Sequence, residues 1–136
     1  MVTPKIKYAH MLPGETEIWD RFLTVTKIPF TRFDYDVHVG ELPDVPEGTP
    51  DYLIPLVQAV YRKRIDAVGF TDQEIWLFEV KQRAGLSAMG QVLAYKLLYV
   101  KDFQPGLPVK MGVVCELKST DVDYLYSQHD IEVFMV

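Results

Sequence analysis

The sequence has little of what marks several specialised classes of protein. Its 136 residues include one cysteine, Cys115, which lies in the apolar run MGVVC and is expected to be a buried thiol. There is no disulfide framework and no zinc-type cysteine spacing. The first ten residues lack the apolar stretch of a signal peptide, so we expect a cytoplasmic, reducing location.

Long apolar runs, glycine-rich phosphate loops and paired histidines are also absent. No run approaches the ~20 apolar residues of a membrane span, so no membrane partner is expected. Without a glycine-rich loop, ATP-driven chemistry is not indicated. The three histidines are far apart and show no metal-binding spacing.

Positive charge is scarce, with 14 lysines and arginines against 19 acidic residues and a net charge of -5. This argues against a protein that holds nucleic acid by a broad basic face, but it allows a local basic patch combined with metal ions. Hydrophobic residues, in contrast, make up 49% of the chain. We therefore expect one globular domain over residues 1–136.

Hydrophobic periodicity predicts alternating helices and strands. Residues 13–26 are typical of a helix with Ile18, Phe22 and Val25 on one face. The later elements are a strand at 30–40, a proline-rich loop at 41–50, a segment at 51–63 that fits a short helix or a strand start, a hairpin at 64–82, a helix from Ala88 to about Lys101 after an N-cap at Ser87, a strand at 109–117, a helix at 119–129 and a strand at 130–136. The order α-β-β-β-α-β-α-β predicts an α/β fold with a mixed central sheet flanked by helices.

Two elements carry more specific expectations. Strict alternation in the strand at 30–40 places Phe33, Tyr35, Val37 and Val39 on one face. The helix at 88–101 has little polar face, so we expect it to be largely buried.

The hairpin RIDAVGFTDQEIWLFEVKQ, residues 64–82, is apolar but ends in charged residues. A turn around residues 71–73 places Asp66 opposite Glu79 and Arg64 opposite Lys81, and all four then share a face. Two opposed carboxylates on a covered sheet repel each other, and burying either one without a partner costs several kcal/mol.

Two interpretations of this cluster remain open on spacing alone. A divalent cation would offset the repulsion, because Mg²⁺ binds one or two carboxylates together with water and phosphate oxygens. A salt-bridged cluster at the end of a sheet, Asp66 with Arg64 and Glu79 with Lys81, is equally compatible. A slip of one residue in the register would separate Asp66 from Glu79.

Asp66, the run Glu79-Val80-Lys81 and the later Gln91-x-x-x-Tyr95 together resemble the PD-(D/E)xK nuclease superfamily, in particular its RecB-like branch. Ile65 stands where the family name has proline. The resemblance covers most of the chain and implies a restriction-endonuclease-like core. It also implies a Mg²⁺- or Mn²⁺-dependent deoxyribonuclease.

The resemblance further implies a role for each motif residue. Asp66, Glu79 and the backbone carbonyl of Val80 would bind one metal ion, a second ion would complete a two-metal site, and Lys81 would orient the attacking water. Gln91 and Tyr95 would brace the site or contact DNA. Some family members add a glutamate from the first helix, for which Glu17 is the better candidate and Glu15 the second.

Basic residues near the motif are candidates for phosphate contacts. They are Arg62, Lys63, Arg64, Arg83 and Lys96, which together with Lys81 could line the mouth of the site. For Arg62 and Lys63, a solvated strand start is an equally good interpretation.

The sequence thus predicts a nuclease acting on DNA phosphodiester bonds. The first alternative is a catalytically idle module of the same fold that binds nucleic acid or a protein partner. The second is a structural module whose charged cluster is a salt-bridge network. The resemblance also implies that so small a core acts as a homodimer or with a partner subunit.

Overall fold

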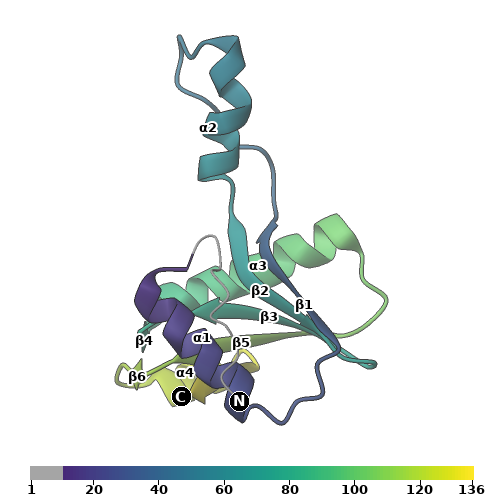
Figure 1. Cartoon of the computed structure of the whole chain (residues 1–136), viewed down its shortest axis with the longest axis vertical. Coiled ribbons are helices and arrows are strands. Elements are labelled where there is room, and N and C mark those ends of the chain that lie inside the picture. Colours follow the sequence, from purple (N-terminus) through teal and green to yellow (C-terminus); the bar gives the residue numbers. More distant parts are fainter. Residues whose placement is uncertain (1–10) are drawn as a thin grey trace.

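The computed structural model describes residues 11–136 (Figure 1). Within them, a five-stranded sheet has the order β1-β2-β3-β5-β7. The strands are β1 (Arg32–His38), β2 (Arg64–Phe70), β3 (Ile75–Val80), β5 (Val109–Cys115) and β7 (Ile131–Met135), with β4 (Arg83–Ala84) and β6 (Leu117–Lys118) in a separate short pair. β1, β2 and β3 are antiparallel, whereas β5 and β7 run parallel to β3. The sheet is therefore mixed, as predicted.

Helices cover both faces of this sheet. The helices of the described residues are α1 (Pro13–Val25), the 3-10 turn η1 (Asp51–Leu53), α2 (Ile54–Tyr61), α3 (Leu86–Phe103) and α4 (Val122–Ser127), and of these α1, α3 and α4 pack on the sheet. On one face, α1 buries Ile18, Trp19 and Phe22 against Phe78 of β3. The expected Val25 is instead exposed, because the buried stripe of the helix ends at Phe22.

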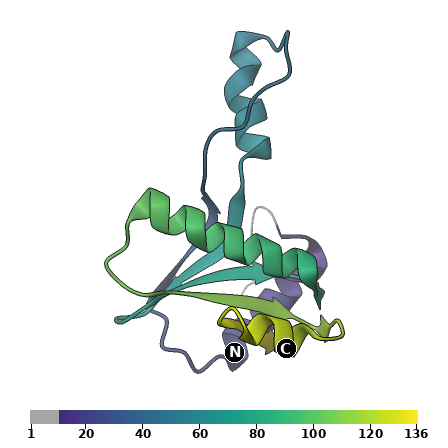
Figure 2. The same ribbon diagram turned by 180° about the vertical axis from the view of Figure 1, so that it is seen from behind.

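The opposite face is covered by α3 and α4 (Figure 2). Tyr95 and Tyr99 of α3 pack on β2 and β3, but Leu97 on the outer face is 74% exposed. The expectation that this helix is largely buried is therefore wrong. Its N-cap is Gly85, and Ser87 lies inside the first turn rather than capping it.

Between β1 and β2, residues 41–62 form an arm that projects from the body of the molecule (Figure 1). It contains the proline-rich loop, η1 and α2, so the ambiguous segment is helical rather than the start of a strand. The Gln58 side chain donates to the Pro43 carbonyl at 3.3 Å, and the Arg62 guanidinium donates to the Gly40 carbonyl at 3.0 Å.

The strand pair that leads into the arm changes faces on the way. Phe33 and Tyr35 pack in the α1 core, whereas Val37 and Val39 pack in the α3 core, so the predicted common face is wrong. The change occurs at Asp36, whose φ of 55° is unusual for a residue other than glycine. β2 also changes faces, since Ala67 lies in the α1 core and Ile65 in the α3 core.

None of the helices among residues 11–136 combines the length and the apolar character required to cross a membrane.

Candidate active site

The β2–β3 hairpin has the predicted register, with Ala67 opposite Phe78 and Phe70 opposite Ile75. The ladder ends at Ala67, and the Val80 amide donates to Oδ2 of Asp66 at 2.8 Å. Beyond Ala67, β2 leaves β3 and continues with β1 toward the arm. The Asp66 carboxylate thus takes the position of a backbone acceptor where the two strands separate.

Because the strands separate here, the amide and the carbonyl of Val80 face the gap between β2 and β3 instead of pairing with the β2 backbone. The next amide, that of Lys81, donates to Val114 of β5 at 3.0 Å, so the Val80 amide points toward β2. The amide and the carbonyl of one residue in an antiparallel strand point to the same side. The Val80 carbonyl therefore faces the Asp66 side of the gap, on the side where the family resemblance implies a metal ion.

Glu79 is almost fully buried, with 4% of its surface exposed. Its Oε1 atom lies 3.5 Å from the ammonium of Lys81. Its Oε2 atom is buried and has no hydrogen-bond partner within residues 11–136. Leaving a buried carboxylate oxygen unsatisfied is costly, so this atom marks a place where a ligand would be stabilising.

Burial also makes the two acids hard to ionise. It raises the pKa of Glu79 to about 8, and the negative charge of Asp66 adds to this effect while Lys81 opposes it. Burial raises the pKa of Asp66 to about 6, against the hydrogen bond from Val80. At neutral pH the Asp66–Glu79 pair therefore retains a proton unless a bound cation displaces that proton.

Gln91 and Tyr95 lie one turn apart on α3, over the same carboxylates. Burial raises the pKa of Tyr95 to about 12, and the charges of Glu79 and Asp66 raise it further, while a hydrogen bond from Gln91 lowers it. The hydroxyl stays protonated and is available as a donor. The Oε1 atom of Gln91 is a second buried oxygen without a hydrogen-bond partner in the described part of the chain.

On the other side of the site, Glu15 in the first turn of α1 acts electrostatically on the carboxylate pair. The charge of Glu15 raises the pKa values of both Asp66 and Glu79. Glu15 accepts the Leu12 amide at 3.2 Å, whereas Glu17 is exposed. Helical spacing could have selected it, because Glu15 lies three and four residues before the buried Ile18 and Trp19.

A groove of about 480 Å³ lies between the start of α1 and the end of β3, and it reaches the carboxylate pair only through Glu15 and Lys81, whose charges act on both acids. Its lining residues are Leu12, Gly14, Glu15, Lys81, Gln82, Arg83 and Glu116. Arg83 is exposed here and reaches the Lys118 carbonyl at 3.4 Å. Of the predicted phosphate-binding residues, Lys81 and Arg83 therefore share one groove.

The other predicted basic residues are less well placed. Arg64 lies 3.5 Å from Oδ1 of Asp36 and is paired with β1, so it is not opposite Lys81 as expected. The cause is the departure of β2 from β3 beyond Ala67. Arg62 binds the base of the arm, and Lys63 is exposed beside it.

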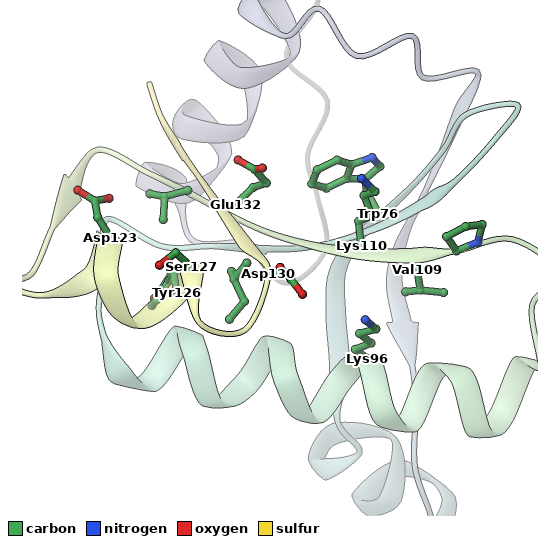
Figure 3. A pocket seen from close by; sticks show the side chains of 12 residues that line it. Trp76, Lys96, Val109, Lys110, Asp123, Tyr126, Ser127, Asp130 and Glu132 are labelled. Carbon is green, nitrogen blue, oxygen red and sulfur yellow. The ribbon is translucent and has the colours of Figure 1, made fainter.

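Lys96 belongs to a different part of the molecule. It points into a pocket of about 680 Å³ where β3, β5 and β7 begin, together with Trp76, Lys110 and Asp130 (Figure 3). Glu79 lies about 10 Å further along β3 from Trp76. The structure therefore removes Lys96 from the mouth of the carboxylate site.

The donors present at the site suit a hard divalent cation. Residues 11–136 hold no group of three or more His, Cys, Asp or Glu side chains arranged for a metal ion. Mg²⁺, however, is usually bound by only one or two carboxylates and keeps several waters. The buried Glu79 with its unsatisfied oxygen, the partly buried Asp66 and a backbone carbonyl facing the same gap fit this requirement.

Comparisons with known proteins give a match at the level of the fold. No protein-family model and no curated protein sequence matches the chain. A solved structure of a complex between EndoMS and double-stranded DNA matches with a TM-score of 0.53 and 16% identity. The match covers 96% of this chain and 48% of the EndoMS chain, so the present chain spans about half of its length. The predicted fold class, a mixed central sheet flanked by helices, is confirmed.

Proposed function

We propose that the chain is a metal-dependent nuclease that hydrolyses DNA phosphodiester bonds. We place it in the PD-(D/E)xK superfamily, near the RecB-like branch, with residues 1–136 as a single nuclease domain. The fold shared with EndoMS, a protein solved in complex with double-stranded DNA, supports DNA as the substrate. The run from Glu79 to Lys81 and the Gln91–Tyr95 pair support the family.

One observation carries the proposal: a carboxylate pair, Glu79 buried and Asp66 partly buried, with an unsatisfied oxygen next to a lysine. Glu79 is buried beside Asp66, its Oε2 atom has no partner in the described residues, and Lys81 lies 3.5 Å from Oε1. The ion pair with Lys81 engages only Oε1 and leaves the buried Oε2 unsatisfied beside a second acid, which costs free energy. A metal site, in contrast, needs both acids and leaves coordination positions open.

The chain's own residues would divide the work as follows. Asp66, Glu79 and the Val80 carbonyl would hold one Mg²⁺ or Mn²⁺ ion. When bound, the ion would polarise the scissile phosphate and offset charge on the leaving oxygen. Lys81 would orient the attacking water and place positive charge beside the phosphate oxygens.

The surrounding residues would position these groups. Tyr95, held protonated by burial and further by the nearby acids, would donate a hydrogen bond at the site, and Gln91 would fix its orientation. Glu15 would bind a metal-bound water or the ion itself from the α1 side. DNA phosphates would enter along the groove that contains Arg83 and Lys81.

A cleavage assay tests the proposal. The wild type is incubated with labelled linear, circular and branched DNA in Mn²⁺ or in EDTA, next to Lys81→Ala. We expect cleavage only with metal, and a loss of at least 100-fold in Lys81→Ala, because the variant removes the charge next to the reacting phosphate. Cutting of circular DNA would identify an endonuclease.

Lys110→Ala is the matched control. Lys110 is also a strand lysine paired with an acid, Glu74 at 3.4 Å, but it lies at the far end of the sheet. The Lys110→Ala variant should therefore cleave DNA at the wild-type rate. Activity that persists in EDTA, or that falls equally in both variants, would contradict the proposed mechanism. Metal binding without any cleavage would favour the idle module.

A further inference from the structure

The outer edge of β7 has unpaired backbone groups. β7 is the last strand of the sheet, and no strand in the described part of the chain lies beyond it. The Val136 amide donates to the Cys115 carbonyl of β5 at 2.9 Å, and alternate residues back along β7 face β5 in the same way. The backbone groups of Ile131, Val133 and Met135 therefore point away from β5 and form a row of donors and acceptors along the edge.

The two edges of the sheet differ in how well they are protected against further pairing. β1, at the opposite edge, is charged at every second position and has a φ of 55° at Asp36. Charged side chains and an irregular backbone are the usual means by which a sheet edge avoids an additional strand. β7 has one charged residue, Glu132, and no proline. Its edge is therefore suited to accept an added strand.

Two grooves run beside β7. The first is the pocket of about 680 Å³ described above, which borders residues 130–133. The second, of about 670 Å³, lies between β7 and the end of α1 and borders residues 133–136. Both are lined by Val133, so together they follow the whole strand. An extended segment of seven residues, roughly 23 Å long, matches the length of this edge.

The second groove is apolar beside the last residues of β7. Phe134 packs in the α1 core, and Val25 and Ile28 line the groove next to it. Val25 is 60% exposed, although it belongs to the predicted apolar face of α1. A large apolar side chain placed opposite Phe134 on an added strand would cover Val25 and remove this apolar surface from water.

The start of β7 is acidic on the same face. Glu132 is exposed and lies two residues before Phe134, so both side chains are on the α1 face. Asp130 is exposed next to it (Figure 3). Of the two lysines in this groove, Lys110 is already engaged in an ion pair, and Lys96 projects from α3 on the opposite face. A residue placed opposite Glu132 is therefore most favourable if it is basic.

We propose that β7 binds an extended segment of another protein as an added antiparallel strand, with the pattern apolar-x-basic. The apolar residue lies opposite Phe134 and the basic residue opposite Glu132. An antiparallel edge strand is common on an otherwise parallel part of a sheet, and antiparallel pairing is slightly more stable per residue. The row of backbone groups selects a peptide chain, because an extended peptide has donors and acceptors at the matching spacing. This binding does not depend on the proposed nuclease activity.

Fluorescence anisotropy with a labelled synthetic peptide tests the added strand. The probe has the sequence TVTFTKT with blocked ends, so that its phenylalanine faces Phe134 and its lysine faces Glu132. We expect saturable binding to the full chain. The matched control is the same peptide N-methylated at its third and fifth residues, which face Met135 and Val133.

N-methylation keeps every side chain of the peptide but removes two amides that donate to the edge, so binding should be lost. Equal binding of the two peptides would overturn the proposal, because the groove would then recognise side chains alone. Absence of saturable binding of TVTFTKT at millimolar concentration would also overturn it. Both outcomes are measured on the wild type and need no variant to fold.

Exchange of charge tests the position of the basic residue. Glu132→Lys should weaken binding of TVTFTKT about fivefold, and the peptide TVTFTET should recover the loss. Glu132 is exposed, so the variant should fold, as checked by thermal melting. Glu47→Lys makes the same change at an exposed acid of the arm and should bind like the wild type. An equal loss in both variants, or no recovery with TVTFTET, would contradict the contact with Glu132.

Discussion

At the scale of single residues, protons and metal ions compete for the Glu79 carboxylate. Its pKa is raised from 4.5 to about 8 by burial and by Asp66. A raised pKa means that the folded state holds a proton that the unfolded state releases between these values. Without metal, stability should therefore fall as the pH rises from about 4.5 to 8.

Glu79→Gln should remove most of this pH dependence and leave the smaller part below about pH 6 that comes from Asp66, whose pKa is raised to about 6. The free energy of unfolding is measured with urea in EDTA at pH 5 and at pH 8. Between these two pH values, the wild type should lose on the order of a few kcal/mol more than the variant. The exposed Glu132→Gln is the control and should follow the wild type. Parallel curves for the wild type and Glu79→Gln would show that Glu79 ionises normally in the fold.

The choice between Glu15 and Glu17 is also a residue-scale question. The charge of Glu15 acts on both site carboxylates, so Glu15→Gln should weaken Mn²⁺ binding several-fold, as measured by titration calorimetry. Glu17→Gln keeps the same helix and changes an exposed side chain, so it should bind Mn²⁺ like the wild type. The reverse ranking would restore the sequence-based choice of Glu17.

At the scale of elements, the sheet depends on a close approach of aromatic rings to β5. A Cβ on Gly112 would lie 2.8 Å from the rings of both Phe78 and Phe134. Gly112→Ala should therefore destabilise the protein by about 1–3 kcal/mol through overpacking, as measured by urea unfolding. Gly106→Ala meets no atom within 4 Å and should be nearly neutral. If the two substitutions lowered the free energy of unfolding equally, the loss at Gly112 would come from the backbone rather than from packing.

The elements also show how far the sequence could predict the structure. The hairpin register followed from the apolar pattern and the turn, and it brought Asp66 and Glu79 together as predicted. The face change at Asp36 was not predictable, because no local pattern announces a positive φ at an aspartate. The separation of β2 from β3 was also missed, since it depends on a carboxylate replacing a backbone acceptor.

At the scale of the whole molecule, metal binding should stabilise the fold. A ligand that binds only the folded state adds about 2.7 kcal/mol at a hundredfold excess over its Kd. The Tm of the wild type should rise with Mn²⁺ concentration, and the Tm of Asp66→Ala should not, in scanning fluorimetry. An equal rise in both proteins would indicate binding elsewhere and would favour a salt-bridge network at Asp66.

The hydrogen bond between the Val80 amide and Asp66 has a practical consequence for observing the site. This amide bonds a side chain whose charge changes with pH and with bound cations, not an invariant carbonyl. Its nitrogen and proton chemical shifts therefore follow the ionisation of Asp66 directly. Val80 is a native spectroscopic probe at the centre of the site, and a solution experiment can read it without any label that perturbs the chemistry.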